Sequence, residues 1–197
     1  AQQMIKEGVL ENPKVDYMFG QHVFPDLESG KVGFKAGKYM ASTDELHITI
    51  IGKGGHAALP EKNKDSIRVA THLITQLHAY FDQNTETPSV FSIGYVEGLG
   101  STNVIPDKVK MMGTLRAIDE DWRANAHKKM LSVSAALAKK YQVEIDFEIR
   151  KGYPFLENDK ALTTKAVESA ETHLGAENVA QLPIRMTAED FAYFTKE

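Results

Sequence analysis

A glycine-rich segment, Gly52 to Pro60, carries the histidine whose setting could do chemistry, His56. The segment follows an alternating apolar pattern at 46–51 that predicts a strand. Glycines let the backbone approach a ligand closely, and Pro60 stiffens the exit. An imidazole held there can donate a hydrogen bond to a developing oxyanion or transfer a proton. On the motif alone, however, a solvent-facing histidine at a strand-to-helix turn is the favoured interpretation.

Hydrophobic periodicity predicts the elements that must position this loop. Strands are expected at 46–51, 89–96, 108–117 and 143–150, with helices at 64–81 and from Asp119 or Glu120 to Tyr141. This β-α-β-β-α-β order is that of the split βαβ, ferredoxin-like arrangement, in which two helices cover one face of a four-stranded antiparallel sheet. The sequence therefore predicts an α+β domain of this type.

The same periodicity assigns side chains to faces. Phe91, Ile93 and Tyr95 are expected on one face of their strand, and Arg116 on the polar side of another. The first helix should begin at a cap, Asn63 or Asp65. Its expected apolar stripe is Ile67, Ala70, Ile74, Leu77 and Phe81, and that of the second helix is Trp122, Ala126, Met130, Val133, Leu137 and Tyr141. His127 falls in a charged helix and is expected to be solvated.

The ferredoxin-like domain is assigned to residues 39–152, inserted into a second domain made of residues 1–38 and 153–197. Each flank is too short to be a domain by itself, so the second domain is expected to be incomplete. Residues 15–24 are interpreted as a buried strand running into a loop. The run Thr187 to Asp190 matches a capping box with Thr187 as the cap, and Glu189 is given no catalytic role.

Composition narrows the classes of function. The 197 residues are 42% hydrophobic and 25% charged, with a formal net charge of −4 and no cysteine. The charge and the lack of a basic patch argue against nucleic acid and anionic membranes as partners, and the lack of cysteine excludes disulfides and thiolate metal sites. No apolar run approaches the roughly 20 residues of a membrane span. Both ends are expected to be cuts within a longer protein.

Five motifs in collinear order resemble the M20 family of metallopeptidases and amidohydrolases, in the branch of hippurate hydrolase-like N-acyl-amino-acid amidohydrolases. They are Gly20 to Pro25, Gly52 to Pro60, Thr102 to Asp107, Gly113 to Ala117 and Ala188 to Phe191. The resemblance implies a zinc-peptidase-like α/β catalytic domain with two metal ions, and an inserted ferredoxin-like lid that forms a homodimer.

The resemblance also implies roles for four residues. His22 looks like a metal ligand, and His56 like the lid histidine that stabilises the tetrahedral intermediate, usually in the partner subunit. Asn103 and Arg116 look like the groups that grip the substrate α-carboxylate, since a guanidinium fork suits bidentate recognition. Without the resemblance, His22 would be a histidine satisfied at a strand–loop junction, and Arg116 an exposed strand arginine or one paired to an acid within the sheet.

The remaining metal ligands and the general-base glutamate of the family pattern are absent from this sequence. For the complete protein, the resemblance implies a cytoplasmic, dimeric enzyme that uses two divalent ions, zinc or manganese, to hydrolyse N-acyl amino acids or dipeptides. The 197-residue chain alone is expected to be inactive and to bind no metal, because it holds one of about five ligands. The alternatives are a non-catalytic dimerisation module and a degenerate homologue that binds acyl amino acids without turnover.

Overall fold

The computed structural model describes residues 1–197, which divide into two compact units. Unit 1 comprises residues 1–42 and 153–197, and unit 2 comprises residues 43–152. The boundary expected at residue 39 falls inside β2 (Gly37–Met40), which pairs with β9 (Leu156–Asn158) in unit 1. Residues 39–42 therefore belong with the flanking segments.

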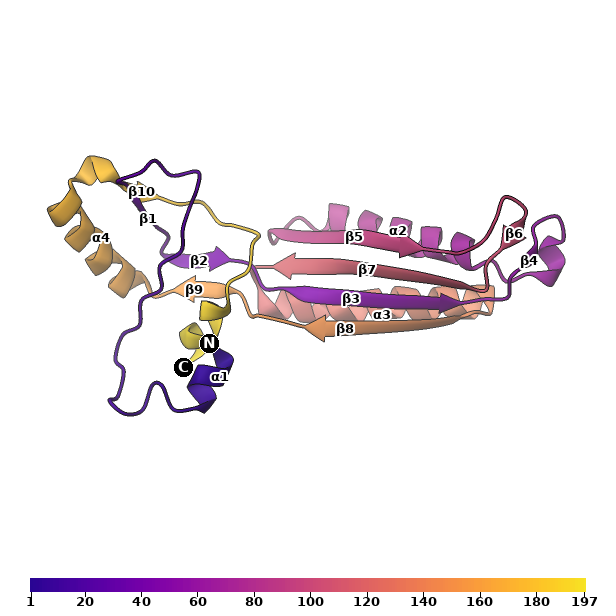
Figure 1. The fold of residues 1–197 in the computed structure, drawn as a ribbon, viewed down its shortest axis with the longest axis horizontal. Helices are drawn as coiled ribbons and strands as arrows, with labels where there is room; N and C mark the ends of the chain where they lie inside the picture. The colour runs from indigo at the N-terminus through magenta and orange to yellow at the C-terminus, as the bar shows by residue number, and fades with distance from the viewer. The chain divides into compact units, whose positions relative to one another are not determined.

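Unit 2 is built on a four-stranded antiparallel sheet with the order β5-β7-β3-β8 (Figure 1). Its principal elements are β3 (Asp44–Ile51), α2 (Ser66–Gln83), β5 (Ser89–Glu97), β7 (Lys108–Ala117), α3 (Glu120–Tyr141) and β8 (Glu144–Lys151). Residues of both helices join the inward strand residues in one core. The expected α+β fold is confirmed.

The core explains the alternation seen in the sequence. Leu46, Ile48 and Ile50 of β3 are at most 2% exposed and pack with the helices. The residues between them face the other side of the sheet, which no helix of unit 2 covers, and on β7 this side carries Lys108 and Lys110. A sheet covered on one face alternates apolar and polar residues, so the pattern in the sequence is direct evidence of this packing.

Strand β5 departs from the expected alternation. The register with β7 shifts between Ile93 and Tyr95, so Tyr95 pairs with Met112. This bulge turns Tyr95 away from the face of Phe91, and its hydroxyl donates to Glu97 at 2.7 Å. The prediction of one shared face for Phe91, Ile93 and Tyr95 was therefore wrong, because one extra residue reverses the side-chain alternation beyond it.

The helices begin at aspartates and bury slightly different stripes from those expected. Asp65 caps α2 by accepting from Arg68 N at 2.9 Å, and Asp119 caps α3 by accepting from Trp122 N at 3.0 Å. On α2 the expected stripe was partly wrong, because Ile67 is 37% exposed. The buried residues of this helix are Ser66, Val69, Ala70, Leu73, Leu77 and Phe81.

Unit 1 has a parallel pair, β1 (Val32–Phe34) with β10 (Val179–Gln181), and the antiparallel pair of β2 with β9. Its helices are α1 (Gln2–Lys6), α4 (Lys160–Leu174) and the 3₁₀ segments η2 (Ala176–Asn178) and η3 (Asp190–Lys196). A small core joins Met40, Leu156 and Ala192. In neither unit does a helix combine the length and the apolar composition that a membrane span requires.

Two predictions for unit 1 were wrong. Residues 15–24 form no strand and are mostly exposed, because no neighbouring strand pairs with their backbone groups. Thr187 does not cap the last helical segment. Glu189 holds that position, and its carboxylate accepts from Phe191 N at 3.4 Å.

Candidate functional site

The glycine-rich segment is fastened to the start of β7 by Asp107. Gly52 N donates to the Asp107 carbonyl oxygen at 2.7 Å, and Gly54 N donates to Asp107 Oδ1 at 2.8 Å. A Cβ on Gly52 would lie 2.1 Å from the Lys64 carbonyl oxygen, and one on Gly54 would lie 2.3 Å from that of Ile105. These glycines therefore make room for neighbouring backbone, whereas the sequence suggested room for a ligand.

The loop brings His56 and Asn103 together. The short strand β4 (Gly55–His56) pairs with β6 (Val104–Ile105), and Ala57 N donates to the Asn103 carbonyl oxygen at 2.9 Å. A further hydrogen bond of 2.8 Å runs from Asn63 Nδ2 to the His56 carbonyl oxygen. Two candidates that are far apart in the sequence thus lie on neighbouring exposed loops, which backbone hydrogen bonds join.

Both side chains are prepared to donate hydrogen bonds. Ala58 N donates to His56 Nδ1 at 3.1 Å, so in the neutral ring the proton is on Nε2. Asn103 Oδ1 accepts from Ser101 Oγ at 3.2 Å, which leaves the amide NH2 of Asn103 as its free donor. An exposed donor of this kind can stabilise a negatively charged oxygen, either an oxyanion or a carboxylate.

Arg116 lies at the other end of the sheet. β7 is 10 residues long, or about 30 Å, and Arg116 lies near its far end, whereas β4 and β6 lie beyond its start (Figure 1). Within one chain, Arg116 and Asn103 therefore cannot hold the same carboxylate. Arg116 Nε donates to Thr114 Oγ1 at 3.1 Å, and no acidic side chain pairs with the guanidinium. An arginine paired to an acid within the sheet is therefore excluded.

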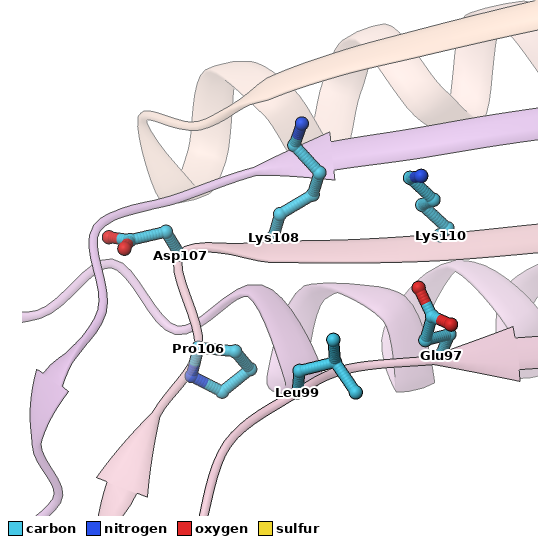
Figure 2. Close-up of a pocket in the computed structure, with 6 residues that line it drawn as sticks. All are labelled: Glu97, Leu99, Pro106, Asp107, Lys108 and Lys110. Atoms are coloured by element: carbon cyan, nitrogen blue, oxygen red, sulfur yellow. The ribbon is translucent and has the colours of Figure 1, made fainter.

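A shallow cavity of about 340 Å³ lies on the uncovered face near the start of β7. Figure 2 shows Lys108 and Lys110 projecting from the same side of β7, with Glu97 of β5 close to Lys110 and the Asp107 carboxylate pointing away from both lysines. Leu99 and Pro106 complete the lining. None of the four residues proposed from the sequence lines this cavity, and we assign it no role.

A buried ionic cluster lies where the chain enters unit 2. Asp44 is 0% exposed and Arg123 is 1% exposed, and Arg123 Nε donates to Asp44 Oδ2 at 3.0 Å. Arg123 also donates to Glu120 and to the Thr43 carbonyl oxygen, each at 2.9 Å. The expectation of a solvated His127 was wrong, since its Nε2 binds the Asp44 carboxylate.

The cluster determines the charge state of Asp44. Burial raises the pKa of its carboxyl group, but hydrogen bonds from His127 and Arg123, together with their charges, lower the pKa to about 2. Sequence analysis missed Arg123 because a charged residue was not considered for the core. Its spacing from Ala126, Met130 and Leu137 places it on the buried stripe of α3, and this register was the available signal.

His22 and Glu189 lie together in unit 1. His22 Nε2 is 3.6 Å from Glu189 Oε2, and His22 Nδ1 is 2.7 Å from the Val23 carbonyl oxygen. The segment that carries His22 passes close to the segment that carries Glu189 at Gly20, where a Cβ would lie 2.9 Å from the Phe191 ring. Two donor groups do not complete a metal site, and the chain has no group of three or more histidines or acids that could hold an ion. His22 and Glu189 could supply only part of one.

Comparisons with known proteins match the whole chain. Residues 43–142 match the family model of a peptidase dimerisation domain. An N-acetyl-L-cysteine deacetylase of Bacillus subtilis (strain 168) is 32% identical over 196 residues, which cover 98% of this chain and 46% of that protein. An N-acetyldiaminopimelate deacetylase of Brevibacillus brevis is 30% identical over 184 residues, covering 92% of this chain and 49% of that protein.

A solved structure has the same fold. The YXEP protein of Bacillus subtilis, described as a dinuclear metal-binding peptidase, is 29% identical and superposes with a TM-score of 0.74. The match covers 99% of this chain and 48% of that one. The chain spans about half the length of the curated relatives it matches.

Proposed function

This chain belongs to the M20 peptidase family, and we propose that it is part of a metal-dependent amidohydrolase that cleaves the amide bond of N-acyl amino acids or dipeptides. The observation that carries the proposal is that two exposed donors, His56 Nε2–H and the Asn103 amide, lie on two loops that backbone hydrogen bonds join. The two deacetylase relatives support an N-acyl substrate.

In this proposal His56 donates its Nε2–H to the oxygen that becomes negative as the amide carbonyl is attacked. Such a donor acts mainly in the transition state, so it accelerates the chemical step more than it tightens substrate binding. Two divalent ions in the complete protein would polarise the carbonyl and supply the nucleophilic water. His22 would contribute one ligand, and the other ligands and the general base would come from the rest of the protein.

The separation of the donors from Arg116 favours a site built from two copies. We propose that His56 and Asn103 of one copy act on substrate in the site of a second copy, whose own Arg116 holds the substrate carboxylate. The roughly 30 Å length of β7 is the reason, because no single copy can bring Arg116 to the loop. A dimer is then required for activity, because each site needs His56 and Asn103 from the other copy.

We propose that the two copies pair along the β5 edge of the sheet. β5 and β8 are the edge strands of unit 2, and their backbone groups on the outer side have no partner within this sheet. β8 places Glu144, Asp146 and Glu148 in exposed positions, whereas β5 exposes Tyr95 and Val96. Charged edges resist pairing and apolar ones permit it. Helix α2, which packs beside β5, would meet its mate across the same two-fold axis.

The test is a panel of N-acetyl, N-benzoyl and dipeptide amides given to the complete protein, with zinc or manganese added back after chelation. Metal-restored hydrolysis of at least one amide is the expected result. The match to a dimerisation domain favours one other candidate, a module that only assembles copies. A protein that dimerises yet hydrolyses none of these amides with either metal would support that module and overturn the enzyme.

A further inference from the structure

Two successive hydrogen bonds hold Arg116 on the uncovered face of the sheet. Arg116 Nε donates to Thr114 Oγ1 at 3.1 Å, and Thr114 Oγ1 donates to the Asp44 carbonyl oxygen at 2.9 Å. A threonine hydroxyl has one hydrogen, and here it points to Asp44. The lone pairs of the oxygen are therefore left to accept from Arg116, and the direction of both bonds is determined.

Asp44, at the end of this relay of two hydrogen bonds, is held rigidly. The Asp44 side chain is 0% exposed and is bound by Arg123 and His127, so its backbone cannot move without breaking the buried cluster. Thr114 and Arg116 are two residues apart on β7 and face the same side. The guanidinium thus has a fixed partner on one side and, in this chain, no acidic partner on the other.

We propose that Thr114 is a positioning residue that restricts Arg116 to end-on recognition of the substrate carboxylate. A guanidinium can grip a carboxylate side-on, through Nε and one Nη, or end-on, through both Nη groups. Because Thr114 occupies Nε–H, only the end-on fork is available, and the side chain is already ordered before substrate arrives. This inference rests on the proposed role of Arg116 in carboxylate binding.

The variants Thr114→Val and Thr114→Ser test the inference in the complete, metal-loaded protein. Valine keeps the shape and removes the hydroxyl, whereas serine keeps the hydroxyl. Thr114→Val should raise KM about three- to tenfold for an N-acyl amino acid, because Arg116 must then be ordered on binding, and should leave kcat unchanged. KM for the matching N-acyl amino amide, which lacks the carboxylate, should not change. Thr114→Ser should behave as wild type.

Arg116→Ala in the same assay distinguishes the positioning role of Thr114 from the carboxylate-binding role of Arg116. If Arg116→Ala weakens only the acid substrate while Thr114→Val has no effect, or affects both substrates equally, the positioning role is overturned and the carboxylate role stands. If Arg116→Ala does not discriminate between the substrates, the carboxylate role itself fails.

An NMR readout checks the hydrogen bond without catalysis. In arginine-labelled complete protein, the Arg116 Nε–H signal, assigned by its loss in Arg116→Ala, should exchange with water faster in Thr114→Val than in Thr114→Ser. Equal exchange in the two variants would overturn the relay.

Discussion

His56 and Arg116 lie at opposite ends of the sheet of unit 2, separated by the length of β7. His56 is held on the loop that Asp107 fastens to the start of β7, and Arg116 lies one residue from its end. Since the strand is about 30 Å long, far more than the length of a substrate amino acid, one copy cannot apply both groups to one molecule. The predictions for activity follow from this separation.

Mixing two inactive variants should restore activity. A heterodimer of His56→Ala and Arg116→Ala copies contains one site with both residues intact and one site with neither. Random exchange makes half of the dimers heterodimers, so activity should return to about a quarter of the wild-type value. Steady-state assays after subunit exchange measure it. A mixture that stays as inactive as its components would show that both residues act within one copy.

Arg116→Ala should distinguish substrates by their carboxylate. Loss of a charge-assisted, bidentate contact should lower kcat/KM for an N-acyl amino acid by roughly 30- to 1,000-fold. The corresponding amide should lose much less. His56→Ala should instead lower kcat for both substrates alike, because stabilisation of the oxyanion does not depend on the carboxylate. Equal loss of acid and amide activity in Arg116→Ala would return this residue to a structural role.

A charge on the β5 edge should separate the copies. Val96 is 54% exposed on this edge, and Val96→Lys should give a monomer in sedimentation at micromolar protein, with loss of amide hydrolysis. The matched control is Glu144→Lys on β8, which should remain a dimer. The reverse result, a monomer only in the β8 variant, would move the interface to the other edge of the sheet.

Asp44→Asn should destabilise unit 2 strongly. The change leaves Arg123, 1% exposed, without its principal countercharge, at a cost of about 3–5 kcal/mol in the free energy of unfolding. The control is Glu148→Gln, which removes an exposed ion pair with Arg150 and should cost far less, because solvent screens an exposed pair. Urea unfolding at neutral pH gives both values, and similar small losses would contradict a structural role for the cluster.

The same carboxylate should make stability depend on acid pH. The pKa of Asp44 is lowered from 3.8 to about 2 in the folded chain. A depressed folded-state pKa contributes stability above the unfolded value, and this contribution is lost as pH falls through the folded one. Asp44 should therefore contribute about 2 kcal/mol that disappears between about pH 4 and pH 2. Urea unfolding across this range should show a shallower decline in Asp44→Asn than in the wild type.

Local pattern was sufficient to predict the fold of unit 2. Burial on one side only produces a periodic pattern among residues that are close in the sequence. The pattern is seen in the alternation of Leu46, Ile48 and Ile50 and in the spacing of Ala70, Leu77 and Phe81. The order of the elements then restricts the topology to few choices. Asp65 and Asp119 were each one of two residues expected at the start of their helix, and such a start can be predicted locally because capping is a contact within one turn.

Tertiary structure alone decided which candidates lie together. The proximity of His56 to Asn103, the distance of both from Arg116, and the Asp44–Arg123 pair all join residues far apart in the chain, and periodicity carries no information about such pairs. The bulge at Tyr95 depends likewise on the register between β5 and β7, and the lack of a strand at 15–24 depends on the absence of a neighbouring strand to pair with. Sequence by itself determined the buried face of β3 and most of the buried residues of α2 and α3, because burial follows from the order of apolar residues. Only the folded chain determined which candidate residues are close enough to act on one substrate molecule, because these distances depend on which strands pair and on the length of the sheet.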